Sequence, residues 1–419
     1  MSLVYSAFVP HPPILLPEIG RGQEQICADT TSAYREIAKS VLTSNAECVV
    51  IVSPHAQLLE RGFTLLSTDP ALGDFLPFGI PGLELSCPNE LQLIKKISTL
   101  PGVHPRGGKL DHGALVPLYF LKEAGWEGSV VELGMPLEDP EEYGAKVGNV
   151  LRKYPKSCAL VASGDLSHRL REDGPYGFDP TGPEFDQSVV KALHRDSSRV
   201  RAISSELAEN AGECGFRSLR FALAAQEGAV KVLSYEVPFG VGYLVAELYR
   251  SSKLAQWART CLAHYLDGRD MKTLELPQDA HFQVRRGCFV TLKKNGELRG
   301  CIGTTQGWQD NLALEIKHNA RAAGTEDPRF WPVEKGELQE ITFSVDVLGE
   351  LERVRETEEL DPWRYGVVVK ARGRSGLLLP HLEGVNTVEE QIGIAKQKAG
   401  LAPGEPVELW RFEVERHYE

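Results

Sequence analysis

The first 250 residues alternate short apolar runs with longer amphipathic stretches, and this alternation restricts the fold more than any other feature of the sequence. Strand-length apolar runs separated by helix-length segments are typical of an α/β fold with a largely parallel or mixed sheet flanked by helices. The segment 22–44 has the length and periodicity of a crossover helix, which predicts a βαβ unit. We expect strands at residues 3–9, 48–53, 129–134 and 158–163.

The chain length indicates two domains, because 419 residues exceed what one hydrophobic core usually supports. The first domain, 1–250, closes with a helix at 216–226 and with one or two strands across 231–248, where Pro-Phe-Gly interrupts the apolar run. The boundary falls near 249–253, and we expect the second domain to span 255–419.

The second domain changes to the pattern of antiparallel hairpins. Asn295-Gly296 separates two alternating runs, which is a strong signal for a two-residue hairpin turn. Pairing through this turn places Cys301 opposite Val290 and Cys288 opposite Gly303. We therefore expect a second α/β domain with an antiparallel sheet.

Charge and composition exclude several classes of partner. The net charge is -12 and no dense basic patch carries interleaved aromatic residues, which argues against a nucleic-acid partner. No apolar run reaches the length of a membrane span and no signal core follows the N-terminus, so we expect a cytoplasmic protein with no membrane partner. The eight cysteines lack CxxC spacing, which favours reduced thiols. A small-molecule substrate is the expected partner, and a homo-oligomer stays open.

Three histidines each follow a predicted strand. His11 stands in VPHPP, His55 in SPHA and His168 in GDLSH. In open α/β sheets ligands bind beyond the carboxyl ends of the strands, so one edge of the sheet gathers these side chains into a shared site. The prolines beside His11 fix the backbone, and a histidine held in a rigid turn suits a metal ligand. Taken singly, each histidine would more often be a solvated or capping residue.

Two further segments have alternative interpretations. His112 in KLDHGALVPL either begins a helix that Asp111 caps or contributes to the site. Residues 171–183, which follow His168, are rich in glycine and proline, and they suit either a lid over the site or a plain surface loop.

A metal site built on these histidines needs a carboxylate. Two neutral imidazoles and one carboxylate leave a divalent ion with open positions, which is typical of non-heme iron(II) that binds substrate and oxygen together. The candidates are Glu213 in NAGECGFRS and Glu236 in SYEVPFG. The residues alone do not separate these two.

Four motifs of the first domain carry a family resemblance. VPHPPIL, SPHA, DHGALVPL and GDLSH, in this order, resemble the LigB-type class III extradiol ring-cleavage dioxygenases, and the similarity extends to about residue 248. The resemblance implies an iron(II) oxidoreductase that uses oxygen to cleave a catechol-like aromatic substrate. It implies iron bound by His11, His55 and Glu213, with His168 as acid/base and His112 in the substrate pocket.

The related Memo family offers the alternative. The segment Glu213-Cys214-Gly215 is similar to an ICG segment of that family, which keeps Cys214 open as a ligand. This resemblance implies a metal-binding redox or modification-pathway protein that does not cleave rings, with zinc, manganese or copper as alternative metals.

The second domain resembles the AMMECR family through GCFVTLKKNGELRGCIGT and YGVVVKARGRSGLLLPHLEGV. The biochemical activity of that family is not established, so the resemblance implies only an α/β fold with an antiparallel sheet. The pairing of the two domains resembles microbial protein sets that include a radical-SAM protein, which implies a pathway partner of that class.

Cys301 is the main candidate residue of the second domain. The predicted pairing places it with Arg299 on one face of the hairpin, where a guanidinium would lower the pKa of the thiol and favour the thiolate. The alternative is an inert cysteine on a core strand. Arg329 and His381 are candidates to line the same cleft.

Overall fold

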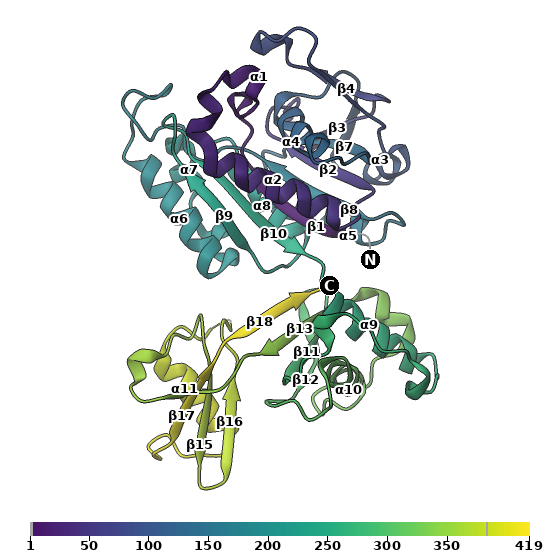
Figure 1. The fold of residues 1–419 in the computed structure, drawn as a ribbon, viewed down its shortest axis with the longest axis vertical. Coiled ribbons are helices and arrows are strands. Elements are labelled where there is room, and N and C mark those ends of the chain that lie inside the picture. The colour runs from purple at the N-terminus through teal and green to yellow at the C-terminus, as the bar shows by residue number, and fades with distance from the viewer. Residues whose placement is uncertain (1–2, 383) are drawn as a thin grey trace. The chain divides into compact units, whose positions relative to one another are not determined.

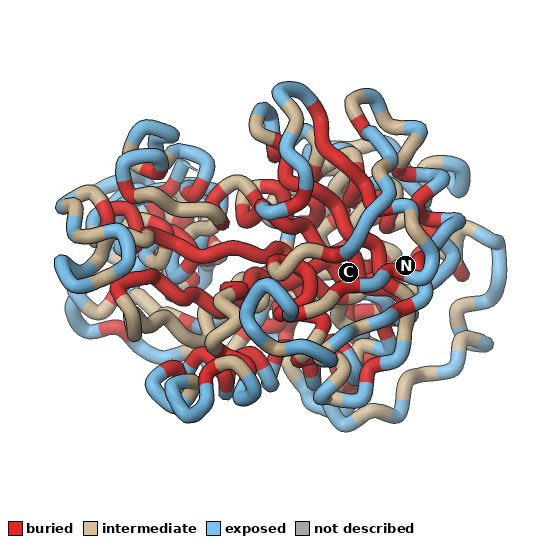
Figure 2. The backbone as a smooth tube through the Cα atoms, turned by 90° about the horizontal axis from the view of Figure 1, so that it is seen from above, coloured by how far each residue is buried: buried red, intermediate tan, exposed pale blue. Residues whose placement is uncertain are grey.

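A computed structural model describes residues 3–382 and 384–419 of the chain. The chain divides into two compact units, Met1–Arg250 and Ser251–Glu419, which are described separately below. In each unit the buried stretches of backbone run through the interior, whereas turns and loop tips are exposed (Figure 2).

The first unit is built on an eight-stranded mixed sheet, in the order β6-β3-β7-β2-β8-β1-β10-β9 (Figure 1). Its four central strands, β7, β2, β8 and β1, are mutually parallel, whereas β10 and β9 pair antiparallel at one side. The strands are β1 (Leu3–Val9), β2 (Cys48–Ser53), β3 (Phe63–Leu66), β6 (Val103–Arg106), β7 (Ser129–Gly134), β8 (Cys158–Ser163), β9 (Lys231–Glu236) and β10 (Tyr243–Arg250). A separate hairpin pairs β4 (Ala71–Asp74) with β5 (Glu84–Cys87).

The central strands are continuous apolar runs because helices cover both faces of the sheet. Every residue of β2, for example, is buried. Helices α2 and α4 pack on one face and α5 and α8 on the other, so the predicted α/β architecture is confirmed. The helices are α1 (Pro17–Gly20), α2 (Ala28–Thr43), α3 (Leu91–Ile97), α4 (His112–Glu123), α5 (Pro140–Arg152), α6 (Thr181–Arg195), α7 (Ser205–Ala211) and α8 (Phe216–Ala225). Within the described residues, no helix is both long and apolar enough to cross a membrane.

The second unit contains two four-stranded antiparallel sheets, β12-β11-β13-β18 and β14-β17-β15-β16. Helices α9 and α10 pack on the first sheet and α11 on the second. The strands are β11 (Cys288–Lys294), β12 (Glu297–Gly303), β13 (Ile341–Leu348), β14 (Glu352–Val354), β15 (Gly366–Ala371), β16 (Arg374–Leu378), β17 (Glu408–Phe412) and β18 (Val414–Tyr418), and the helices are α9 (Lys253–Leu266), α10 (Leu312–Thr325) and α11 (Val388–Lys398). The antiparallel character expected from the sequence is therefore confirmed.

The β11–β12 hairpin has the predicted turn but not the predicted register. Asn295 and Gly296 both have positive φ, as a two-residue turn of this kind requires. A bulge then follows: Lys293 pairs with Leu298 but Leu292 pairs with Gly300, so Arg299 is the extra residue. Simple counting from the turn misses this insertion, which shifts every pair beyond it by one.

Candidate metal centre

Three neighbouring parallel strands end at the same edge of the sheet of the first unit. Val9 of β1 pairs with Ser163 of β8, and Val52 of β2 pairs with Ala162 of β8. The segments that follow these strands are therefore brought together, as the strand-end argument predicts. His11, His55 and Asp165 are the polar residues that this edge gathers.

His11 is the central residue of the site. Its Nε2 lies 2.9 Å from Nε2 of His55 and 3.6 Å from Sγ of Cys214. Its Nδ1 lies 2.9 Å from Oγ of Ser163, and its backbone N–H donates to Asp165 Oδ1 at 3.0 Å. Burial lowers the pKa of His11 to about 4, so the imidazole is neutral and offers a lone pair.

His112 lies close to His11 and His55 and also begins a helix. Asp111 is the N-cap of α4, and its Oδ1 accepts a hydrogen bond from the Ala114 N–H. The ring of His112 stacks on that of His55 with 4.1 Å between centroids. Nitrogen atoms of His11, His55 and His112 all lie within 4.8 Å of one another.

Glu213, the expected carboxylate ligand, does not join this cluster. Its Oε2 accepts a hydrogen bond from the backbone N–H of Phe216, the first residue of α8, and burial raises the pKa of the carboxyl group. A carboxylate at the start of a helix satisfies an otherwise unpaired amide, and Glu213 belongs to neither group of candidate ligands among the described residues. Glu236 is likewise engaged elsewhere, because it accepts from the Thr30 N–H in the first turn of α2.

Cys214, the alternative ligand candidate from the sequence, lies near His11. The ligand atoms of His11, Asp165 and Cys214 form a second group within 4.8 Å. Asp165 was missed in the sequence, although it follows β8 directly in the same GDLSH motif as His168 and meets the strand-end criterion that selected the histidines. Burial raises the pKa of the Cys214 thiol well above its ordinary value, so a metal ion that binds there has to displace a proton.

Each donor separation from His11, taken as a pair, is compatible with two ligands of a transition-metal ion, although at different bond angles. With metal–nitrogen distances of about 2.1 Å and metal–sulfur distances of about 2.3 Å, two nitrogens at a right angle lie roughly 3 Å apart and a nitrogen and sulfur at a tetrahedral angle roughly 3.6 Å apart. The observed separations are 2.9 Å for His11 to His55 and 3.6 Å for His11 to Cys214, whereas His55 and Cys214 do not share a group of ligand atoms within 4.8 Å. In addition, Oδ2 of Asp111 is buried with no hydrogen-bond partner among the described residues.

His168 lies beside the cluster and not within it. Its Nδ1 contacts the Gly212 carbonyl oxygen, and its Nε2 is 3.7 Å from Oδ2 of Asp165. Burial opposes the charged form, but the Asp165 carboxylate outweighs this effect and the pKa of His168 is raised above its ordinary value. Tyr176, from the 171–183 loop, has its ring centroid 5.0 Å from that of His168, so the loop contacts the acid/base candidate.

A hydrogen-bond network connects the backbone N–H of His55 to Glu132. The His55 N–H donates to Ser53 Oγ at 3.2 Å, and Ser53 Oγ donates to Asp111 Oδ1 at 2.6 Å. The Asp111 N–H in turn donates to Glu132 Oε1 at 3.1 Å, and the other oxygen of Glu132 pairs with Arg106. Burial, followed by the neighbouring Asp111, raises the pKa of Glu132 to about 8.

The environment of Cys301 in the second unit differs from the expectation. Because of the bulge, Cys301 pairs with Thr291 and not with Val290, and the Thr291 hydroxyl donates to Sγ at 3.3 Å. Arg299 instead forms an ion pair with Glu337 at 2.7 Å. Burial raises the pKa of the Cys301 thiol, which favours the alternative of an inert cysteine on a core strand.

The Asp327–Arg329 pair contacts the backbone of Cys301. Asp327 Oδ2 accepts from the Cys301 N–H at 2.8 Å, and Arg329 Nη2 donates to the Cys301 carbonyl at 3.2 Å. The same two side chains bind each other through Nε–Oδ1 and Nη2–Oδ2 contacts of 2.9 and 2.7 Å. His381, expected in the same cleft, lies edge-on against Trp363, with 5.4 Å between ring centroids.

An α/β sheet that brings imidazoles and a thiol together beyond its parallel strands defines the first unit as a domain with a candidate metal centre. The description "catalytic LigB subunit of aromatic ring-opening dioxygenase" belongs to the family whose sequence profile matches residues 5–246, and the AMMECR1 profile matches residues 255–417. The chain therefore belongs to the LigB family and carries an AMMECR1 domain, as the two resemblances implied.

Relatives of known sequence include one with the same organisation. A protein of Clostridium acetobutylicum is 39% identical over an alignment that is 469 positions long with its gaps and that covers 100% of both chains. A protein of Thermotoga maritima is 50% identical over 165 residues, which are 39% of this chain and 95% of that protein. A crystal structure of an uncharacterized Escherichia coli protein aligns with 58% of this chain and 99% of its own at 17% identity, with a TM-score of 0.42.

Proposed function

We propose that the LigB domain binds one transition-metal ion at His11, the residue shared by the two groups of candidate ligands, and that His55 and Cys214 move toward each other to complete the site. The bound ion acts on a small-molecule substrate in a redox or modification reaction, without cleaving an aromatic ring. The observation that carries this proposal is the placement of two adjacent side chains, those of Glu213 and Cys214. The thiol of Cys214 faces His11, whereas the carboxylate of Glu213 is bound to the start of α8.

The donor set indicates which metals suit the site. Imidazole and thiolate together favour zinc and copper, whereas manganese prefers oxygen ligands. Such an ion supplies Lewis-acid or one-electron chemistry to a bound substrate. A deprotonated Cys214 and neutral imidazoles are the forms that bind it.

The neighbouring residues have roles that do not require them to bind the ion. Asp165 fixes the backbone of His11 and lies near Nε2 of His168. His168 is thereby oriented to hold a proton at Nε2 and to exchange it with a substrate, as a general acid or base does. His112, stacked on His55, limits the orientations of that ligand.

Extradiol ring cleavage with iron(II) is the second candidate function. It is favoured by the placement of His168 next to the histidine cluster and by the match to the ring-opening dioxygenase family. It requires that Glu213 leave the helix start and reach the ion, which exchanges one hydrogen bond for one metal contact. A radical-SAM pathway partner and a homo-oligomer remain predictions from the sequence.

Metal titration followed by an oxygen assay tests both candidates. Metal-free protein is titrated with Zn²⁺, Cu⁺ and, anaerobically, Fe²⁺, and the iron form is then mixed with a catechol panel and oxygen. We expect one equivalent of tightly bound metal that His11→Ala and Cys214→Ala both lose, and no oxygen uptake with catechols. Oxygen uptake with the visible absorbance of ring-opened products would establish the second candidate, and failure to bind any of the three metals would overturn both.

A further inference from the structure

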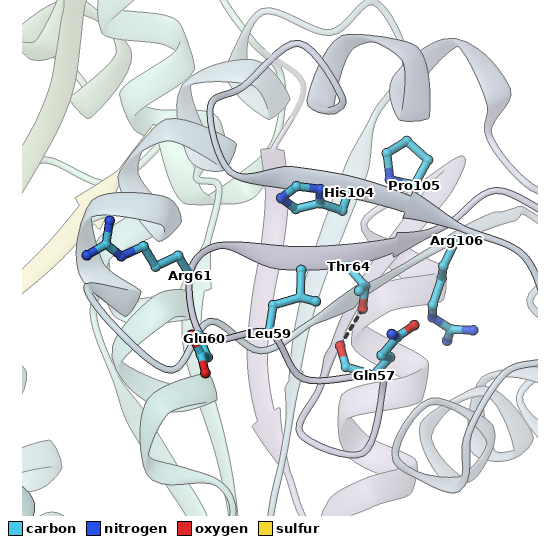
Figure 3. Close-up of a pocket in the computed structure, with 8 residues that line it drawn as sticks. All are labelled: Gln57, Leu59, Glu60, Arg61, Thr64, His104, Pro105 and Arg106. Atoms are coloured by element: carbon cyan, nitrogen blue, oxygen red, sulfur yellow. Dashed lines mark hydrogen bonds between the residues drawn. The ribbon is translucent and has the colours of Figure 1, made fainter.

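A surface cavity of about 510 Å³ lies at the edge of the sheet in the first unit, between β3, β6 and the loop that follows β2 (Figure 3). Arg61 and Glu60 lie at one end of it and Arg106 at the other, with His104 and Thr64 between them. The cavity is large enough for a small organic molecule. None of the lining residues belongs to the two groups of candidate metal ligands.

The side chains around this cavity suit an oxyanion. Arg61 is exposed, and no ion pair or hydrogen bond of its guanidinium is found among the described residues. A guanidinium binds carboxylate or phosphate oxygens through a planar pair of N–H groups. His104 offers a further ring nitrogen, and Gln57 offers an amide.

The cavity is connected to the metal site by the chain and by hydrogen bonds. Gln57 and Arg61 lie on the same loop as His55, and Thr64 Oγ1 anchors this loop by donating to the Gln57 carbonyl at 2.9 Å. Arg106, at the other end of the cavity, pairs with Glu132. Glu132 is the far end of the network that runs through Asp111 and Ser53 to the backbone of His55.

We propose that this cavity binds a small molecule through a carboxylate or phosphate group held by Arg61, with His104 contacting another part of the same ligand, and that this ligand tightens metal binding at His55. The first half stands on the cavity alone, whereas the second half rests on the proposed function. A ligand that bridges Arg61 to β6 orders the 54–62 loop and thereby holds His55 in its metal-binding position. Because coupling between two sites is reciprocal, the metal tightens anion binding by the same factor.

The first experiment measures anion binding to the metal-free full-length protein by calorimetry, with inorganic phosphate and succinate in separate titrations. We expect saturable binding of at least one anion, weakened about tenfold or more in Arg61→Ala, because a charge-assisted hydrogen bond is lost. Glu60→Gln should bind more tightly, since a like charge is removed. Lys39→Ala, which removes an exposed positive charge from α2, is the matched control and should bind as the parent does. Comparison of the two titrations shows whether the site prefers phosphate or carboxylate.

The second experiment measures Zn²⁺ affinity by competition with a chromophoric chelator, with and without the anion that binds better. We expect the anion to tighten Zn²⁺ binding about fivefold in the parent and to leave Arg61→Ala unchanged. Direct complexation of Zn²⁺ by the anion affects both proteins equally, so their difference isolates the coupling.

The outcomes separate the two proposals. Absence of saturable anion binding, or equal binding by parent and Arg61→Ala, overturns the oxyanion site whatever the metal does. Anion binding that leaves Zn²⁺ affinity unchanged or weaker overturns the coupling and leaves the metal site intact. Absence of Zn²⁺ binding in every condition contradicts the proposed function and not the anion site.

Discussion

Gly164 and Gly215 pack backbone against backbone, so closely that a Cβ added to Gly164 would lie 2.1 Å from the Cα of Gly215. This contact brings the turn before α8 against the end of β8. The N–H groups of Cys214 and Gly215 both donate to the Asp165 carbonyl, at 3.3 and 2.9 Å. The position of the Cys214 thiol relative to His11 therefore depends on two residues that have no side chain.

Gly164→Ala should disturb the metal site without touching a ligand. The new Cβ meets backbone, which cannot turn aside as a side chain does, so we expect a loss of about 1–3 kcal/mol in unfolding free energy. Displacement of Cys214 should lower metal affinity as well. Urea unfolding and metal titration measure the two effects. Gly107→Ala is the control, because its added Cβ meets only the Thr68 hydroxyl at 3.8 Å, and unaltered metal affinity in Gly164→Ala would contradict the account.

Substitutions of the two adjacent ligand candidates should affect different properties. The change at Cys214 should lower metal affinity, and the change at Glu213 should lower stability. We expect Cys214→Ser to lose more than about 100-fold in metal affinity, since even partners outside the ligand set are typically worth 10–100-fold. Glu213→Ala should keep its metal affinity and lose about 0.5–2 kcal/mol of stability, the usual effect of removing a helix cap. Metal content after desalting, with circular dichroism as a folding control, compares the two. A metal-free Glu213→Ala beside a loaded Cys214→Ser would restore the carboxylate assignment.

The meeting of His11 and His55 could be predicted because β1 and β2 run parallel on either side of β8, so that both strands end at the same edge of the sheet. The choice between Glu213 and Cys214 as the metal ligand could not be predicted from the sequence. Adjacent residues in a turn point in different directions, and the free amide of Phe216 competes for the carboxylate. The register of the β11–β12 hairpin failed for a similar reason, since the contacts that hold Arg299 outside the ladder come from Glu337 and Trp331, distant in sequence.

His168→Phe should retain near-parental metal occupancy. The imidazole of His168 is held by the Gly212 carbonyl and lies near Asp165, and it belongs to neither group of candidate ligands. If the iron form proves to cleave catechols, the same variant should lose about a hundredfold to ten-thousandfold in turnover through lost proton transfer. Metal analysis measures the occupancy, and oxygen uptake measures the turnover. Loss of the metal itself would make His168 a ligand.

Acid should weaken the second unit through Asp327. The hydrogen-bonded Arg329 lowers the pKa of this carboxyl to about 2 from an ordinary 3.8, so the folded state binds the proton less readily than the unfolded chain. The stability from this group is thus present above the unfolded pKa and is lost as the pH falls through the folded value. We expect about 1–2 kcal/mol of unfolding free energy to disappear between about pH 5 and pH 2, reduced from the full shift because Arg329 is half exposed.

Tryptophan fluorescence can follow this loss, because five of the six tryptophans, at positions 257, 308, 331, 363 and 410, lie in the second unit. Asp327→Asn should be less stable than the parent at pH 7 and should approach it at pH 2. A constant difference between the two proteins across this range would remove Asp327 as the titrating group.

The Asp327–Arg329 pair also occupies backbone hydrogen-bonding groups on the outer edge of β12. β12 is the outer strand of its sheet, and a bare outer strand is a template on which other chains add strands and aggregate. At Cys301 the carboxylate accepts the N–H and the guanidinium donates to the carbonyl, which are the two hydrogen bonds that an incoming strand would make there. Two side chains thus imitate one residue of a neighbouring strand, and the sheet ends at β12 without a further strand to close it.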